Sequence, residues 1–229
     1  MLKFTPHQES GIICCANMTT IESIEPIEPI VAIESRFKEV TGLTHLDLSV
    51  PHFSKGDNQQ QKTSKSDYRN FGFVTTPLWL VDEMLEPEIP NLTLTSTTCD
   101  ACSGCGQFSI RLMRKLHDKF IKMGIVEEKV NAWITKVWLP KLHYFTEFQF
   151  SNVAKLIYIF GPNINVYVGD SLNMRFSSSE NTESGLLFFN SKEKKWVNLP
   201  NLMTHILPIK DDLNALIRLF SALEKKICE

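Results

Sequence analysis

The chain has 229 residues, of which 43% are hydrophobic and 22% are charged, enough for one sizeable domain with extensions or two small domains. A net charge of -2 and a pI near 6.3 exclude the strong overall basic bias of many nucleic-acid-binding or membrane-surface proteins. No run approaches the roughly 20 apolar residues of a membrane span, and no apolar stretch typical of a secretory signal follows Lys3. We therefore expect a cytoplasmic protein with reduced thiols and no membrane partner.

Residues 1–70 predict an N-terminal extension. The segment IESIEPIEPIVAIES alternates Ile with Glu and Pro, and its two prolines argue against one continuous helix. Residues 31–43 predict a short amphipathic helix that ends at Gly42. Residues 54–70 are polar and nearly free of apolar side chains, which predicts a mobile loop or linker. We therefore divide the chain into this extension and a main domain, 71–229.

The main domain alternates helical and strand patterns. Pro77 suits the first turn of a helix, and Thr75 or Thr76 suits the cap before it. Later, Pro140 predicts the end of a helix that begins near residue 127. Further helices are predicted at 78–85, 107–124, 151–161 and 209–227, and strands at 90–98, 142–148, 163–170 and 185–190. This alternation predicts an α/β fold with a parallel sheet flanked by helices.

Three cysteines, Cys99, Cys102 and Cys105, are spaced in a way that suggests a metal site. Iron–sulfur clusters require four thiolates, and no fourth cysteine follows before Cys228. A zinc site would need another ligand, such as His117 or His143. The number of available ligands therefore argues against a metal site in this stretch.

The same stretch, TSTTCDACSGCGQF, also fits a loop that binds a nucleoside cofactor. A predicted strand ends near Asp100, a turn with Gly104 and Gly106 follows, and a helix begins near Gln107. This arrangement brings a ligand against backbone N–H groups at a helix N-terminus. Glycines permit close approach because they lack a Cβ atom.

Here the sequence resembles the N6-adenine DNA methyltransferases of the class I, S-adenosylmethionine-dependent fold. Their Gly-x-x-x-Thr-Pro segment is matched by Gly72, Thr76 and Pro77. Their cofactor loop, Asp-x-x-(small or Cys)-Gly-x-Gly-x-Phe, is matched by Asp100, Ser103, Gly104, Gly106 and Phe108. The resemblance implies a Rossmann-like core in which Thr76, Pro77, Asp100, Gly104 and Gly106 surround the methionine part of S-adenosylmethionine.

The resemblance continues to about residue 190. It implies that Glu147, at the end of the second strand, binds the ribose hydroxyls. Gly169, Asp170 and Leu172 match the family's Gly-Asp-x-Leu, which implies that Asp170 accepts from the adenine amino group. Phe148 would pack on the adenine face. The implied activity is adenine-specific DNA methylation, by a whole enzyme or by a fragment of one.

The sequence departs from the family where the catalysis is expected. The family's Asn/Asp-Pro-Pro-aromatic motif is absent, and Asn190 is the only catalytic candidate that follows the predicted fourth strand. About forty residues remain after that strand, too few for a complete sheet and a target-recognition domain. The core is therefore expected to be incomplete at its C-terminal end. The alternative is a catalytically inactive, methyltransferase-like interaction or regulatory protein, such as a partner subunit.

DNA contact has limited support in the sequence. One predicted helix concentrates five basic residues that could contact phosphate or form an ordinary solvated face. These residues are Arg111, Arg114, Lys115, Lys119 and Lys122.

Overall fold

The computed structural model of the chain describes residues 28–41, 76, 78–170, 185–190, 193 and 195–228. Several features singled out above, namely Gly72, Pro77, Leu172 and the segment 54–70, lie outside these residues.

Five strands form one sheet at the centre of the described chain. They are β1 (Thr98–Ala101), β2 (His143–Glu147), β3 (Asn165–Val168), β4 (Leu186–Asn190) and β5 (Lys195–Asn198). Their order is β1-β2-β3-β4-β5, with parallel pairing as far as β4 and antiparallel pairing between β4 and β5. The predicted α/β class is therefore confirmed, whereas the antiparallel β5 was not predicted.

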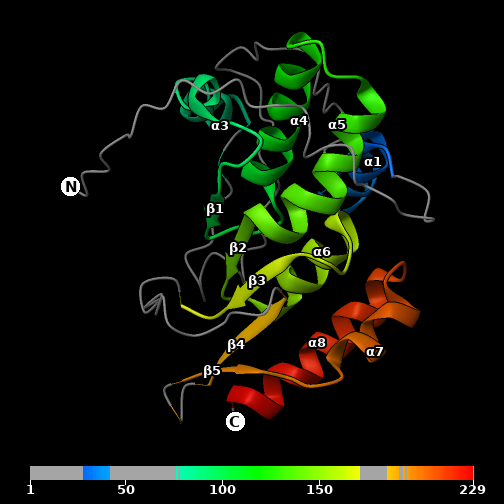
Figure 1. Ribbon diagram of the computed structural model, residues 1–229. Coiled ribbons are helices and arrows are strands. Elements are labelled where there is room, and N and C mark those ends of the chain that lie inside the picture. The colour runs from blue at the N-terminus through cyan, green and yellow to red at the C-terminus, as the bar shows by residue number, and fades with distance from the viewer. Residues whose placement is uncertain are drawn as a thin grey trace.

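Helices alternate with the parallel strands. They are α1 (Ile30–Thr41), α3 (Leu78–Leu85), α4 (Gln107–Lys122), α5 (Glu127–Trp133), α6 (Phe150–Phe160), α7 (Leu202–Ile206) and α8 (Leu213–Cys228), with 3-10 helices η2 (Ile89–Asn91) and η5 (Leu207–Ile209) and a π-helix, η3 (Ile134–Leu142). Figure 1 shows α4, α5 and α6 together on one side of the strands. Buried residues of α4, α6, β2, β3 and β4 belong to one hydrophobic core, in which Phe120, Phe145 and Phe188 are fully buried.

The strand order has a consequence for ligand binding. The segment β1-α4-β2-α6-β3 is a βαβαβ unit, an arrangement that is compatible with one half of a Rossmann-like fold. In the Rossmann order the fourth strand lies beside the first, and the ligand crevice forms where the order reverses. Here β4 pairs with β3, so the spatial order of the five described strands is the same as their order in the chain. These strands therefore do not form the reversal at which that crevice would lie.

The strand predicted at 90–98 is wrong over most of its length, because β1 begins only at Thr98. Pro90 instead lies in the 3-10 helix η2. Side-chain hydroxyls then form local hydrogen bonds, from Thr93 N to Ser96 Oγ at 2.8 Å and from Thr95 N to Thr93 Oγ1 at 3.4 Å. Such bonds compete with ladder pairing, and they explain why a β-branched stretch forms a turn.

The predicted stop at Pro140 is also wrong. The helix continues through this proline to Leu142 as the π-helix η3. Ile134 and Trp138 are fully buried there, so packing holds the segment helical. A π-helix pairs residues five apart, and His143 N accordingly donates to Trp138 O. This wider turn relieves the clash that a proline ring makes in an α-helix.

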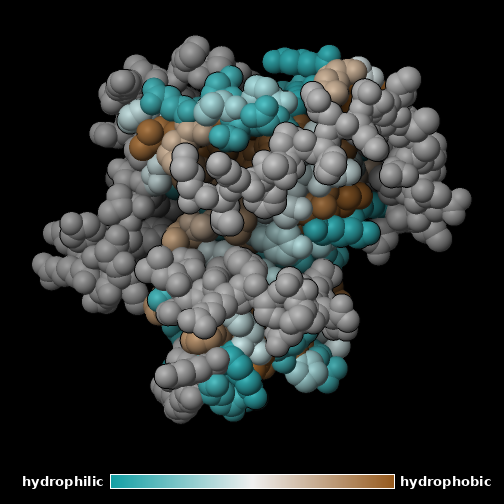
Figure 2. All heavy atoms as spheres, turned by 60° about the vertical axis from the view of Figure 1, so that its left-hand side comes forward, coloured by the Kyte–Doolittle hydropathy of each residue, from teal (hydrophilic) through white to brown (hydrophobic). Residues whose placement is uncertain are grey.

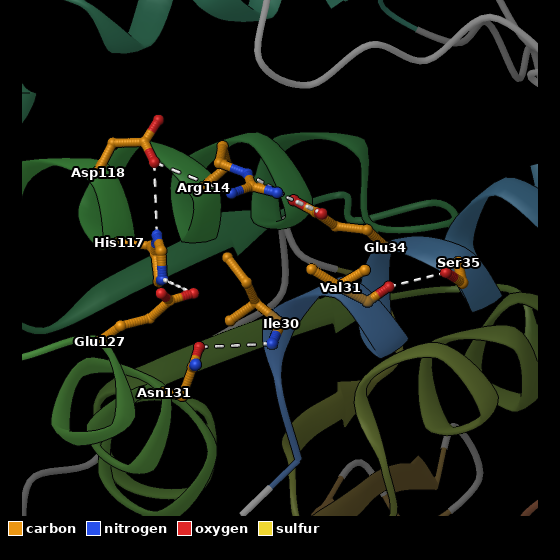
Figure 3. Close-up of polar contacts among 9 residues, drawn as sticks. All are labelled: Ile30, Val31, Glu34, Ser35, Arg114, His117, Asp118, Glu127 and Asn131. Atoms are coloured by element: carbon orange, nitrogen blue, oxygen red, sulfur yellow. Dashed lines mark hydrogen bonds and ion pairs between the residues drawn. The ribbon is translucent and has the colours of Figure 1, made fainter. Parts of the chain in front are cut away.

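Helix α1 packs into the same core, although the sequence placed it in an extension. Ile30, Ile33 and Phe37 are at most 1% exposed. Figure 3 shows two polar contacts that α1 makes with later helices: Ile30 N donates to Asn131 Oδ1 of α5 at 3.5 Å, and Glu34 pairs with Arg114 of α4. The first described helix is therefore an integral part of the α/β domain.

Apolar surface is scattered over the described residues. Val31, Met84, Met123, Val126, Phe148 and Leu207 are at least half exposed. On the face shown in Figure 2, hydrophobic residues occur in small separate areas between hydrophilic ones. Single exposed apolar residues of this kind are common on protein surfaces.

Candidate functional site

The carboxyl ends of the parallel strands bring together most of the residues singled out in the sequence. The loop 102–106 follows β1, and Glu147 ends β2. Asp170 lies two residues beyond β3, and Asn190 ends β4. The registers Ala101↔Thr146, Glu147↔Val168 and Val168↔Phe188 align these ends along one edge of the sheet. Ligands of open α/β sheets bind at the carboxyl ends of the strands, at a point where the strand order reverses; the five described strands supply the carboxyl ends but no such reversal.

The loop after β1 is fixed to the end of β2 by hydrogen bonds. Ser103 N donates to Thr146 O at 2.8 Å, and Cys102 N donates to Thr146 Oγ1 at 2.9 Å. The Ser103 hydroxyl donates to Asp100 O at 2.7 Å, and Gly106 N donates to Ser103 O at 2.7 Å. The loop therefore has a defined shape before any ligand binds.

Glu147 holds this loop. Its Oε2 accepts a hydrogen bond from Gly104 N at 2.7 Å, and its Oε1 accepts one from Gln149 N at 2.7 Å. The residue is 6% exposed, and this burial raises the pKa of its carboxyl. Both carboxylate oxygens therefore already accept a hydrogen bond from a backbone N–H group, although a carboxylate can accept further hydrogen bonds.

The motif glycines Gly106 and Gly169 are required by packing. Gly106 has φ of 83°, and a Cβ atom there would lie 2.5 Å from the Phe160 ring of α6. A Cβ atom at Gly169 would lie 2.7 Å from the Phe189 Cβ atom of β4. Both distances are too short for real contacts, so glycine at these positions has a structural explanation independent of any cofactor.

Asp100 belongs to a buried hydrogen-bond chain beneath α4. Its Oδ2 accepts from the Ser109 hydroxyl at 2.7 Å, Ser109 Oγ is 2.8 Å from His143 Nε2, and His143 Nδ1 is 2.8 Å from Thr98 Oγ1. Burial raises the pKa of Asp100 to about 6 and lowers the pKa of His143 to about 3. Ser109 and His143 are at most 1% exposed, so this chain of four residues joins α4 to the sheet and presents no accessible nucleophile.

Gln107 was missed by the sequence reasoning. It is the first residue of α4 and is 7% exposed. Its side-chain Nε2 is buried without a hydrogen-bond partner. A buried amide donor that is left unsatisfied is costly, and this one lies at the start of the helix that follows the glycine loop. An amide side chain directly after Gly-x-Gly was the available signal.

The other candidate residues lie around the same edge or near its margin. Phe148 is 58% exposed, directly after Glu147. Asp170 and Thr76 are half-buried. Asn190 Oδ1 accepts from Glu193 N at 3.0 Å, so the catalytic candidate takes part in the turn between β4 and β5.

The cysteines do not assemble a metal site within the described residues, where no three His, Cys, Asp or Glu side chains are grouped as possible ligands. Cys99 and Cys102 are exposed, whereas Cys105 is buried and lies 3.8 Å from Asn152 Oδ1. Although Cys99 as a whole residue is exposed, partial desolvation of its sulfur, together with the nearby Asp100 carboxylate, raises the pKa of the Cys99 thiol.

Four of the five basic residues on α4 serve internal contacts. Arg111 is buried and pairs with Asp82 of α3, and Arg114 pairs with Glu34 of α1. Lys115 Nζ is 2.7 Å from Glu86 Oε2. Lys119 donates to the carbonyl oxygens of Ile89, Pro90 and Leu92. This helix face therefore packs against neighbouring segments, which neither the phosphate-binding nor the solvated-face interpretation anticipated.

No family model, no curated protein and no solved structure matches this chain. Among the described helices, none is both long and apolar enough to cross a membrane.

Proposed function

We propose that the carboxyl edge of the sheet binds S-adenosylmethionine, and that the protein is an adenine-specific DNA methyltransferase or a fragment of one. One observation carries the cofactor assignment. A βαβαβ unit brings the glycine loop, Glu147 and Asp170 to one edge, where such units bind nucleotides. The DNA substrate rests on the sequence resemblance alone.

Gln107 supports the fit of this cofactor. Its buried Nε2 needs an acceptor, and the cofactor's methionine carboxylate is an acceptor of the kind expected at a helix N-terminus. Because Nε2 is buried, the Gln107 amide would have to turn toward the loop 102–106 in order to hold the methionine part. Because the loop is already fixed to β2, little ordering would be required on binding.

The nucleoside part would lie over the ends of β2 and β3. Asp170 would accept from the adenine amino group, and the exposed ring of Phe148 would cover the adenine face. Glu147 would accept from a ribose hydroxyl through lone pairs that its two backbone partners leave available. Glu147 would therefore have two roles, because the same carboxylate that binds the ribose also holds Gly104 of the loop in place.

The bound cofactor would supply an activated methyl group. The chain would have to orient the acceptor amine, and Asn190 is its only candidate for this role. Two observations favour a second function, that of a cofactor-binding subunit without catalytic activity. Asn190 Oδ1 already accepts a hydrogen bond from Glu193 N, and β4, which carries Asn190, lies beside β3 and not beside β1 as in the Rossmann order. That subunit would act with a protein partner.

The cofactor site is tested by calorimetric titration with S-adenosylmethionine and S-adenosylhomocysteine. Asp170→Ala should weaken binding about tenfold or more, the cost of losing a hydrogen bond to a charged group. Asp211→Ala, which changes an exposed carboxylate at the far end of the chain, should bind like the wild type. Equal affinities for all three proteins, or no binding to folded wild-type protein, would rule out the site.

Activity is tested separately. Radioactive methyl transfer to unmethylated DNA, lost in Asn190→Ala with cofactor binding intact, would support the enzyme. Cofactor binding without methyl transfer would support the partner-subunit alternative.

A further inference from the structure

A cavity of about 500 Å³ lies at the edge of the sheet opposite the candidate cofactor site. Its lining includes Asn163, just before β3, Leu186, the first residue of β4, and Asn198, the last residue of the antiparallel β5. In Figure 1 the carboxyl end of β3 points to the left, whereas α7, which supplies another wall, lies at the right. A cavity of this volume accommodates a small organic molecule.

The lining combines positive charge with apolar surface. Lys136 and Lys141 both come from the π-helix η3. Leu186, Leu202 and Met203 supply apolar walls, and the two leucines are each 6% exposed. No acidic side chain is among the described residues that line the cavity. Its chemistry therefore suits a molecule that carries a negative charge on an apolar body.

The π-helix explains why two lysines reach one cavity. Residues five positions apart lie roughly above one another when hydrogen bonds join residues five apart. In an α-helix, with 3.6 residues per turn, the same two positions would lie roughly 140° apart around the axis. π-Helical turns are rare and frequently occur at functional sites, and η3 extends over nine residues.

One buried side chain, Asn165, joins two segments whose residues Pro140 and Gly185 line the cavity. Asn165 is 3% exposed, and its Nδ2 donates to Pro140 O at 2.9 Å and to His143 O at 3.1 Å. Its Oδ1 accepts from Gly185 N at 3.1 Å. The end of η3 and the start of β4 are thus held together through β3, so the cavity is formed before a ligand binds.

We propose that this cavity is a binding site for a small amphipathic organic carboxylate. Lys136 and Lys141 would bind the carboxylate, and the apolar side chains of β4 and α7 would cover a short hydrocarbon or aromatic body. The site lies at the other edge of the sheet from the proposed cofactor site and does not depend on that assignment.

Octanoate is a suitable probe, observed through the methyl resonances of the methionines. Met203 lines the cavity, whereas Met113 is fully buried in the core and Met123 is 66% exposed near the end of α4. In two-dimensional spectra of methyl-labelled protein, octanoate should shift the Met203 resonance saturably. The Met113 and Met123 resonances should stay in place. The Met203 resonance is assigned from the spectrum of Met203→Leu.

Matched ligands and variants test the two halves of the proposal. Acetate, without the hydrocarbon, and 1-octanol, without the charge, should each bind at least about tenfold more weakly than octanoate. The double variant Lys136→Gln/Lys141→Gln should weaken octanoate binding roughly tenfold. The exposed pair Lys129→Gln/Lys225→Gln should leave it unchanged.

Three results would overturn the proposal. The first is a Met203 resonance that octanoate does not shift. The second is equal binding of octanol and octanoate, which would show that charge is not recognised. The third is equal weakening of octanoate binding in the two lysine pairs, which would show only a general charge effect.

Discussion

Replacing Asp100 with asparagine should change the way in which the stability of the protein depends on pH. Asp100 is 7% exposed beneath α4, and burial raises the pKa of its carboxyl from 3.8 to about 6. Because the pKa is higher in the folded state, the stability contribution of Asp100 is fully present below about pH 4. It is lost as the pH rises through about 6.

The magnitude follows from the size of the pKa difference. A shift from 3.8 to about 6 corresponds to roughly 3 kcal/mol, at about 1.4 kcal/mol per unit. The asparagine side chain of Asp100→Asn would keep an oxygen that accepts from the Ser109 hydroxyl but would carry no charge. Roughly 0.5 kcal/mol of the Asp100 contribution is already lost at pH 4, so the free energy of unfolding of the variant, minus that of the wild type, should rise by about 2.5 kcal/mol between pH 4 and pH 8.

His143 also affects how the stability of the wild type depends on pH. The contribution of Asp100 is therefore seen more clearly in the difference between variant and wild type than in the wild-type stability alone. Burial lowers the pKa of His143 from 6.5 to about 3, so its stability contribution is present above about pH 6.5 and is lost as the pH falls. Between about pH 4 and 6 the unfolded chain binds a proton at His143 while the folded chain binds one at Asp100. The two slopes then nearly cancel in the wild type, and Asp100→Asn should expose the slope that belongs to His143.

Urea unfolding followed by tryptophan fluorescence, at half-unit steps from pH 4 to 8, measures this difference directly. The control is Asp211→Asn, whose side chain is 80% exposed and whose difference from wild type should stay flat. If the Asp100→Asn difference also stays constant within about 0.5 kcal/mol, then Asp100 titrates as it does in the unfolded chain and the argument from burial is refuted.

Three further stability predictions come from the packing and can be checked by urea unfolding at neutral pH. Gly106→Ala should destabilise the fold by about 3 kcal/mol, because strain at φ of 83° adds to a clash with Phe160. Gly124→Ala, with φ of 86° and nothing within 4 Å, should cost only about 1 kcal/mol, and equal losses would contradict the clash. Asp82→Ala removes the partner of the buried Arg111 and should lower the free energy of unfolding by about 3 kcal/mol or more. Glu86→Ala, which removes the exposed partner of Lys115, should lower it by at most about 1 kcal/mol. Phe37→Ala should cost about 3 to 5 kcal/mol because α1 belongs to the core, whereas a loss below about 1 kcal/mol would mean that α1 is dispensable.

Local periodicity predicted most of the elements that carry the domain. Phe108, Leu112, Leu116 and Phe120 recur about one turn apart, and α4 forms there. The strands β2, β3 and β4 and the helices α6 and α8 also occur within or close to their predicted ranges. Glu147, Asp170 and Asn190 were singled out through the family resemblance, and the parallel registers of β2, β3 and β4 place them along one edge of the sheet.

The remaining features depend on contacts between distant parts of the chain. The partners of Arg111 and Arg114 lie 29 and 80 residues away, so the sequence of α4 alone could not distinguish internal ion pairs from a DNA-binding face. The helix through Pro140 depends on the burial of Trp138, which overrides a local stop signal. The double role of Glu147 depends on where Gly104 N points, and no spacing rule predicts this.

The position of α1 also affects how the protein folds during synthesis. Arg36 Nε donates to Ile159 O, which lies 123 residues later in the chain. At translation rates of about 5 to 20 residues per second, roughly 6 to 25 s separate the synthesis of these two partners. Throughout that interval Ile33 and Phe37, which end fully buried, belong to a nascent chain whose α6 has not yet been made. The first described helix therefore emerges from the ribosome well before its contacts on α6 exist, so the docking of α1 onto α6 cannot precede the synthesis of residues 150–160.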